Sequence, residues 1–183
     1  MAIAITTPLT KNSIKNLKAG DSVLLSGTIY TGRDAAHKRM IESFQKDKSW
    51  PFELQGQIIY YVGPCPAKPG QVIGSCGPTT SGRMDAYAPT LIAEGLCGMI
   101  GKGMRTAQVV DSMTTHGAIY FGALGGAGAL IAQTVKKARV VAYEDLGAEA
   151  IYKLEVENLP LVVIIDCEGN NLYDIGKAQY RTL

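Results

Sequence analysis

The sequence predicts an α/β protein with a mixed sheet, and two features of the chain indicate this class. Short runs rich in β-branched and aromatic residues alternate with segments of helical periodicity, as in proteins built on parallel strands. Several runs lie close together near residues 57–75, which leaves room for antiparallel pairing. Of the 183 residues, 46% are hydrophobic and 19% are charged, so the chain can bury a sizeable core. Because no repeat or linker divides the sequence, we expect one domain over residues 1–183.

The first expected elements are a strand, a helix and a second strand. Ser22–Thr31 (SVLLSGTIYT) and Gln57–Val62 (QIIYYV) are rich in β-forming residues, and each predicts a strand. Between them, Asp34–Gln45 predicts a helix, because apolar residues recur every four positions along one face. These apolar residues are Ala36, Met40 and Phe44.

Glycine and proline divide the middle of the chain. Three prolines and two glycines among residues 63–70 predict a loop, and a short strand is expected at Gln71–Ser75. Residues 76–85 (CGPTTSGRMD) predict a second glycine-rich turn, which leads into a helix that ends at Glu94. The next expected elements are a strand at Cys97–Ile100, a helix at Thr106–Met113 and a strand at Ala118–Phe121.

The last third of the chain is expected to continue the alternation. A glycine-rich stretch opens a helix at Ala127–Gln133. Two apolar runs, Val140–Tyr143 and Leu161–Asp166, predict buried strands, and Ala148–Glu157 is expected to be the helix between them. The Asn-Asn pair at 170–171 predicts a turn before a final short strand near Leu172–Ile175.

Composition and charge exclude several classes of function. Lys and Arg number 18 and Asp and Glu number 16, so the net charge of +2 does not suit a protein that coats nucleic acid or membrane. The sequence has no apolar run of about 18 residues and no secretory signal at its N-terminus. The four cysteines form no C-x-x-C pair and the two histidines are far apart. We therefore expect a cytoplasmic protein with reduced thiols and no metal site of its own.

The segment TGRDAAHKR (31–39) lies at a strand-to-helix junction and is a candidate anion site. The N-terminus of a helix favours anions, and Arg33 could add a bidentate grip on a carboxylate or phosphate. His37 follows four residues later, so it shares a face of the first helical turn with Arg33. The structural alternative is that Asp34 caps the helix while Arg33 and His37 are solvated.

The turn at 77–85 is the second candidate. Three hydroxyl residues (Thr79, Thr80 and Ser81) and then Arg83 can form a cradle for a small anion. The structural alternative is an ordinary turn in which Asp85 pairs with Arg83.

A third cation, Lys102, lies between two glycines after a predicted strand. A lysine in such a loop can equally be solvated. Together with the arginines of the two preceding segments, it provides three cations on three separate loops, which suits a small dianion such as a dicarboxylate. A strong base, a metal site and a redox centre are not evident. The sequence therefore has residues that can bind a substrate but lacks the other groups that a complete active site needs.

Four segments together resemble a known family: TGRDAAHKRM (31–40), GPTTSGRMD (77–85), Gly-Lys-Gly (101–103) and DCEGNNLY (166–173). They are similar to the β subunit of class I iron–sulfur fumarate hydratase, which is the C-terminal domain in single-chain forms of that enzyme. The resemblance covers essentially the whole chain, and it implies a swivelling β/β/α domain. The L-tartrate dehydratase β subunit is a close relative, but Gly82 and Asp85 fit the fumarate hydratase pattern better.

The resemblance implies a hydro-lyase that reversibly hydrates fumarate to L-malate. It implies a [4Fe–4S] cluster that is bound by three cysteines of an α subunit and not by this chain. The expected partner is therefore a fumarase α subunit, in a heterodimer or an α2β2 assembly, and the chain is expected to be active only with it. The open alternatives are an L-tartrate or mesaconate hydro-lyase, and a non-catalytic anion-binding assembly module.

The resemblance also implies roles for single residues. Arg33 and Arg83 match carboxylate-binding arginines, Lys102 matches a substrate-binding lysine, and Thr79 matches the residue that moves the C3 proton. His37 is expected to orient the site. Supporting roles are expected for Asp34, Thr80, Ser81 and Asp85.

Overall fold

The computed structural model describes residues 1–181 of the chain, and seven strands form one sheet. The strands are β1 (Ile3–Thr6), β2 (Ser22–Thr31), β3 (Ile58–Tyr60), β4 (Gly98–Gly101), β5 (Ile119–Gly122), β6 (Val135–Ala142) and β7 (Ile151–Ile165). The α-helices are α1 (Lys11–Lys15), α2 (Asp34–Asp47), α3 (Ala88–Ala93), α4 (Ala107–His116), α5 (Gly128–Thr134) and α6 (Leu172–Tyr180). Two 3₁₀ helices, η1 (Ser81–Met84) and η2 (Glu144–Glu149), complete the regular structure.

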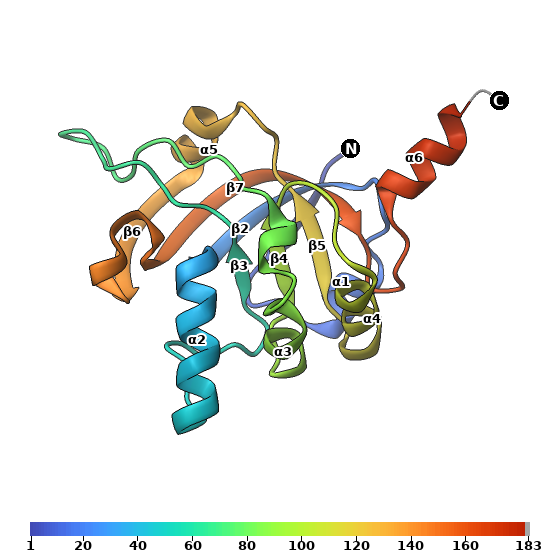
Figure 1. Cartoon of the computed structure of the whole chain (residues 1–183). Helices are drawn as coiled ribbons and strands as arrows, with labels where there is room; N and C mark the ends of the chain where they lie inside the picture. The colour runs from blue at the N-terminus through green and yellow to red at the C-terminus, as the bar shows by residue number, and fades with distance from the viewer. Residues whose placement is uncertain (182–183) are drawn as a thin grey trace.

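The sheet is mixed, and it closes on itself. The strand order is β1-β2-β3-β4-β5-β7-β6, and β2 pairs in addition with β7. Neighbours from β1 to β5 are parallel, whereas β7 runs antiparallel to β2, β5 and β6 (Figure 1). This arrangement confirms the predicted α/β class with a mixed sheet. The predicted domain range includes residues 182–183, which lie outside the described residues.

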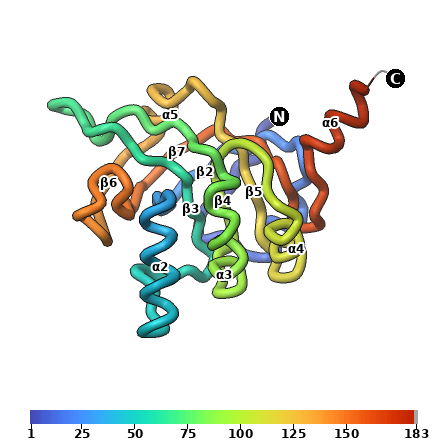
Figure 2. The backbone as a smooth tube through the Cα atoms, viewed as in Figure 1, coloured from blue at the N-terminus to red at the C-terminus, as the bar shows by residue number. Residues whose placement is uncertain are grey.

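Two apolar clusters bury the two faces of the sheet, because successive side chains of a strand point to opposite faces. Along β3, Ile58 and Tyr60 belong to one cluster, whereas Ile59 and the following residue Tyr61 belong to the other. Helices α2, α3 and α4 lie against the face that carries the second cluster (Figure 1). The chain after β3 runs away from the sheet as an extended arm and returns at η1 (Figure 2).

The expected helix at Ala148–Glu157 is wrong. Most of this segment lies in the 15-residue strand β7, which pairs with β2 on one side and with β5 and β6 on the other. Leu154 and Val156 are buried on one face of the sheet, and Ile151 is buried on the other. Pairing on both edges therefore overrides the moderate helix propensity of its Glu, Lys and Leu residues.

Three other expected elements differ from the structure. Leu172–Ile175 is not a strand but the first part of α6, because the Asn171 side chain accepts a hydrogen bond from the Tyr173 backbone and caps the helix. Gln71–Ser75 belongs to the arm and forms no strand. The helix expected to end at Glu94 is divided into η1 and α3, and Pro89 lies in the first turn of α3. Among residues 1–181, no helix is long and apolar enough to cross a membrane.

Candidate functional site

The segments singled out from the sequence meet at one edge of the sheet, where parallel strands end. Lys102 follows β4 directly and forms a short parallel bridge with Thr80. The Lys102 N–H donates to the Thr79 carbonyl at 3.3 Å, and the Ser81 N–H donates to the Lys102 carbonyl at 2.9 Å. These backbone hydrogen bonds hold the turn at 77–85 and the loop after β4 side by side, as in a short continuation of the sheet.

Thr79 is fixed against the end of β3. Its backbone N–H and its side-chain hydroxyl both donate to the Tyr61 carbonyl, each at 2.8 Å. Because the hydroxyl proton is used in this bond, the lone pairs of Oγ1 remain to accept a hydrogen bond. The Thr80 side chain, by contrast, is exposed.

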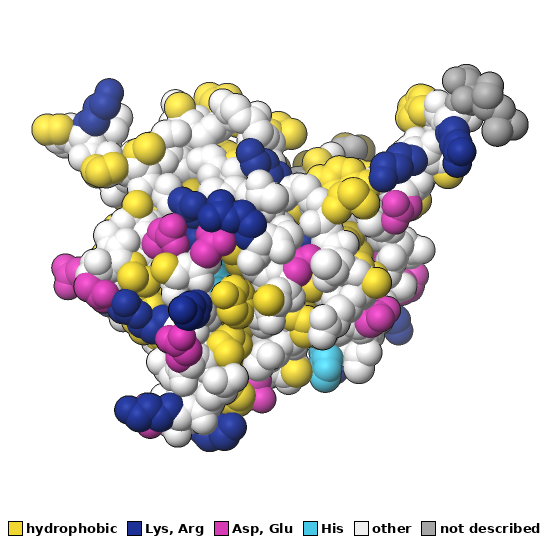
Figure 3. Space-filling model, in the orientation of Figure 1, with side chains coloured by type: hydrophobic (Ala, Val, Ile, Leu, Met, Phe, Trp, Pro, Cys, Tyr) yellow, Lys and Arg dark blue, Asp and Glu magenta, His cyan; other side chains and the backbone are white. Residues whose placement is uncertain are grey.

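Arg33 and Arg83 converge on the carboxylate of Asp34. Arg83 Nε donates to Asp34 Oδ1 at 2.9 Å, and Arg83 Nη2 lies 2.8 Å from Asp34 Oδ2, so the guanidinium grips the carboxylate with two parallel contacts. Arg33 Nε lies 4.0 Å from Asp34 Oδ2, and its Nη2 lies 3.6 Å from Glu149 Oε1. Lys and Arg side chains gather with acidic side chains above the N-terminal end of α2 (Figure 3). We call Arg33, Asp34, Arg83 and Glu149 the arginine cluster.

The structural alternative, in which Asp34 caps the helix, is wrong. Arg33 occupies the N-cap position with an extended backbone, and Asp34 is the first residue of α2. A backbone N–H group in the first turn of α2 is paired by a side chain from another element, because the Ala35 N–H donates to Glu149 Oε2 at 3.0 Å. Asp34 is therefore free to pair with the arginines.

His37 is buried and not solvated. Its Nδ1 lies 2.9 Å from the Arg33 carbonyl oxygen, and the rings of Tyr61 and Tyr87 pack near it. Burial lowers the pKa of His37 to about 4, so the imidazole is neutral at neutral pH and Nδ1 donates to the carbonyl. This bond holds the backbone of Arg33. Within residues 1–181, Nε2 has no hydrogen-bond partner.

The structural alternative for the turn, in which Asp85 pairs with Arg83, is also wrong. Asp85 pairs with Arg105, whose Nε donates to Asp85 Oδ1 at 2.6 Å and whose side chain is 0% exposed. Arg105 was not predicted, because a single arginine ahead of a helix carries no pattern that distinguishes it from a surface residue. Ser81 is buried too, and its hydroxyl lies 2.8 Å from the Tyr120 hydroxyl. Ser81 and Asp85 therefore face the interior below the turn.

Lys102 lines a hollow of about 350 Å³ next to the turn. The walls are mainly apolar and come from the glycine-rich loop after β5, from β7 and from the start of α6, with Leu124, Ile164 and Tyr173 among them. Hydrophobic side chains gather on the surface between β5 and α6 (Figure 3). Arg33 and Arg83 do not line this hollow. The structure thus joins Lys102 to Thr79 through the backbone and Arg33 to Arg83 through Asp34, at one sheet edge.

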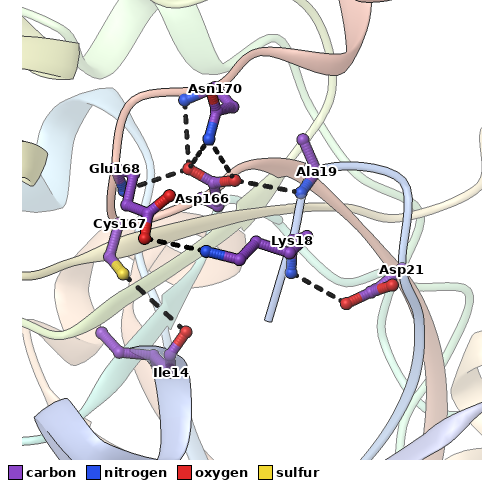
Figure 4. A network of polar contacts seen from close by, with 8 residues as sticks. All are labelled: Ile14, Lys18, Ala19, Asp21, Asp166, Cys167, Glu168 and Asn170. Carbon is purple, nitrogen blue, oxygen red and sulfur yellow. Dashed lines mark hydrogen bonds and ion pairs between the residues drawn. The ribbon is translucent and has the colours of Figure 1, made fainter. Parts of the chain in front are cut away.

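The first five residues of the segment DCEGNNLY, 166–170, form a polar network that stabilises the fold (Figure 4), whereas its last residue, Tyr173, lines the hollow beside Lys102. The buried Asp166 carboxylate accepts hydrogen bonds from the backbone N–H groups of Ala19, Glu168 and Asn170 at 3.0–3.2 Å. The Asn170 side-chain amide donates to the same carboxylate at 3.0 and 3.2 Å. Asp166 therefore ties the end of β7 to the loop before β2 and shapes the turn before α6.

Within 1–181, no group of three or more His, Cys, Asp or Glu side chains is placed to hold a metal ion. All four cysteines are free thiols. Burial raises the pKa of Cys76 and of Cys97 to about 11, so both are protonated at neutral pH. The described residues therefore do not fit an iron–sulfur cluster.

Comparison with known proteins identifies the family. The sequence matches the family model described as fumarase C-terminus over residues 1–176. It is 42% identical over 151 residues to the aerobic class I fumarate hydratase of Escherichia coli K12, which covers 81% of this chain and 28% of that protein. It is 35% identical over 165 residues to fumarate hydratase 2 of Leishmania major, which covers 89% of this chain and 29% of that protein.

A Methanocaldococcus jannaschii protein, provisionally named L(+)-tartrate dehydratase subunit beta, matches at nearly full length. It is 39% identical over 182 residues, which is 96% of this chain and 93% of that protein. The chain spans only 26–28% of the class I fumarate hydratases of Salmonella typhimurium and Escherichia coli. These relatives are named as fumarate hydratases or as a tartrate dehydratase subunit. Such enzymes are hydro-lyases, which add water to a carbon–carbon double bond or eliminate water to form one. The chain therefore belongs to the fumarase C-terminal family.

Proposed function

We propose that this chain is the β subunit of a hydro-lyase that acts on a small dicarboxylate, with the reversible hydration of fumarate to L-malate as its reaction. The observation that carries the proposal is the contact between Arg83 and Asp34. There, a guanidinium already grips a carboxylate at 2.8–2.9 Å, beside a second arginine. That geometry recognises carboxylates, and it lies at the same sheet edge as Thr79 and Lys102.

In this proposal, each residue acts through a stated group. Arg33 and Arg83 bind one substrate carboxylate by charge-assisted hydrogen bonds, and the Lys102 ammonium binds the other end of the diacid. Thr79 moves the proton at C3: in hydration the hydroxyl, which donates to the Tyr61 carbonyl in this structure, gives its proton to C3, and in dehydration the Thr79 alkoxide takes that proton back. A threonine hydroxyl does not ionise readily, so the nearby cations must stabilise the alkoxide.

The two acids of the arginine cluster affect how a diacid binds. Asp34 and Glu149 offset the charges of Arg33 and Arg83. A dianion must therefore displace Asp34 from Arg83 or gain further positive charge from Lys102 and from the partner. This requirement supports a site that is completed by a second subunit.

We propose a fumarase α subunit as that partner, in a heterodimer or an α2β2 assembly in the cytoplasm. We propose that the partner holds the [4Fe–4S] cluster implied by the family; the described residues of this chain bring together no group of three or more His, Cys, Asp or Glu side chains for it. When bound there, it supplies a Lewis acid for the substrate hydroxyl. The M. jannaschii relative, which is named as a beta subunit, supports a separate chain of this length. We propose that residues 1–183 form the single β-subunit-like domain of this assembly.

The second candidate is an L-tartrate hydro-lyase, which the full-length match to the M. jannaschii protein favours. A Cβ at Gly82 would meet only the Met104 carbonyl oxygen, at 3.6 Å, which is an ordinary van der Waals contact. The turn can therefore accept a Cβ atom at this position.

The test is turnover by the chain co-purified anaerobically with its α partner. Fumarate absorbance reports hydration, and L-tartrate and mesaconate are offered in competition. We expect Arg83→Ala to lower kcat/KM by about 30-fold or more, because a charge-assisted carboxylate contact contributes roughly 2 kcal/mol. The matched control is Arg39→Ala, since Arg39 grips Asp145 in the same manner, at 2.7 and 2.9 Å, outside the arginine cluster.

The outcomes separate the candidates. The site assignment is wrong if Arg83→Ala and Arg39→Ala both stay within a few-fold of the wild type. Faster turnover of L-tartrate than of fumarate identifies the second candidate. Diacid binding without any turnover identifies a non-catalytic anion-binding module.

A further inference from the structure

A buried polar layer lies directly beneath the site, and the proposed reaction does not use it. Its members are Ser81, Asp85, Arg105 and Tyr120, and all four are buried. Buried polar groups are costly unless they are fully paired, so a layer of four beside a site needs a physical reason.

The first connection in the layer runs through hydroxyl groups. The Tyr120 hydroxyl donates its single proton to the Gly103 carbonyl at 2.9 Å. The Ser81 hydroxyl, 2.8 Å from the Tyr120 oxygen, must therefore be the donor in that contact. Tyr120 thus joins the turn that carries Thr79 and Arg83 to the loop that carries Lys102. A Cβ at Gly101 would overlap the Ser81 hydroxyl, so the first glycine of Gly-Lys-Gly allows this approach.

The second connection runs through the Asp85 carboxylate. Oδ1 accepts from Arg105 Nε at 2.6 Å, and Oδ2 accepts from the Thr106 backbone N–H at 2.6 Å. The Arg105 guanidinium lies 5.3 Å from the centre of the Tyr61 ring and 5.0 Å from that of Tyr120. These aromatic contacts compensate part of the cost of burying a charge.

Both connections join the same two segments. On the turn, Arg83 lies between the anchor points Ser81 and Asp85, and on the loop, Lys102 comes just before the anchor points Gly103 and Arg105. We propose that Tyr120 and Arg105 are positioning residues that set the spacing between Arg83 and Lys102, and thereby the length of diacid that the site accepts. The inference rests on the proposed function.

The sharpest variant is Tyr120→Phe, which removes one hydroxyl group and keeps the ring beside Arg105. The matched control is Tyr60→Phe. Tyr60 is equally buried, but it belongs to the other apolar cluster, and its hydroxyl donates to the Cys76 carbonyl. The assay is turnover by the complex with the α partner, with inhibition by malonate, succinate and glutarate as a measure of length preference.

We expect Tyr120→Phe to raise KM about 10-fold and to flatten the preference among the three inhibitors. We expect kcat to change less than three-fold, because Thr79 is held by the Tyr61 carbonyl and not by Tyr120. Ser81→Ala should repeat this pattern, since it breaks the same connection. Tyr60→Phe should leave KM and the inhibitor profile unchanged.

A readout without turnover accompanies the kinetics. In amide NMR spectra of the chain, Tyr120→Phe should shift the resonances of residues 79–83 and 101–105 together, whereas Tyr60→Phe should not. The inference is overturned if the wild type is active and Tyr120→Phe matches Tyr60→Phe in KM and inhibitor profile. A wild-type complex that is inactive on every diacid overturns the proposed function, and this inference with it.

Discussion

The substitution Asp166→Asn should destabilise the fold without altering the site. The buried carboxylate accepts five hydrogen bonds, from three backbone N–H groups and twice from the Asn170 amide. An asparagine keeps one acceptor oxygen and replaces the other with an NH2 group. If the oxygen of the new asparagine takes the Oδ1 position, its NH2 group takes the Oδ2 position and faces two donors, the Ala19 N–H and the Asn170 amide. Two hydrogen bonds are then lost, and the NH2 group is opposed to two other donors.

The magnitude follows from these contacts. Losing charge-assisted bonds and leaving buried donors without acceptors costs roughly 2–4 kcal/mol of unfolding free energy. Urea denaturation of the full chain measures this loss. The control is Asp174→Asn in the same region, because Asp174 is exposed and its carboxylate accepts one side-chain bond, from Asn171 at 2.9 Å. A difference between the two variants below about 0.5 kcal/mol would refute the reasoning.

Two further predictions concern buried titratable groups. His37 has its pKa lowered by burial from 6.5 to about 4, so the unfolded chain binds the extra proton between these values and stability is lost as the pH falls from 6.5 towards 4. His37→Gln should remove up to about 1.4 kcal/mol per pH unit of this slope in urea titrations, whereas the exposed His116→Gln should leave it unchanged. Among the thiols, iodoacetamide should alkylate the exposed Cys65 first and Cys76 and Cys97 far more slowly, because burial shields both and raises the pKa of each to about 11. Peptide mass mapping over time measures the order, and early labelling of Cys76 would contradict it.

Local patterns in the sequence were enough for elements that depend on nearby residues. Ser22–Thr31 is a strand with the predicted bounds, and the helix expected from Asp34 begins at that residue. The strand is rich in β-forming residues and the helix has a strong apolar periodicity, and both signals depend only on residues that are close together in the sequence. The family resemblance, now confirmed, also depended on short segments and not on the fold.

Elements decided by distant partners were not predicted. Residues 151–157 belong to a strand because β6, the preceding strand, pairs with them on one side and β2, which lies far away along the chain, pairs with them on the other. Asn171 was expected to be a turn residue but is the N-cap of α6, because its side chain accepts a hydrogen bond from the Tyr173 N–H. In both cases, the same residues support two local conformations and the tertiary contacts select one.

The candidate site shows the same division. The sequence by itself determined which side chains are candidates for the chemistry, since Arg33, Thr79, Arg83 and Lys102 stand out by residue type and by their glycine-rich surroundings. Only the tertiary structure decided their partners. Asp34 pairs with Arg83 and does not cap α2, and Asp85 pairs with the buried Arg105 and not with Arg83. The physical reason is that pairing energies depend on distance and burial in three dimensions, and neither quantity can be read from the order of residues along the chain.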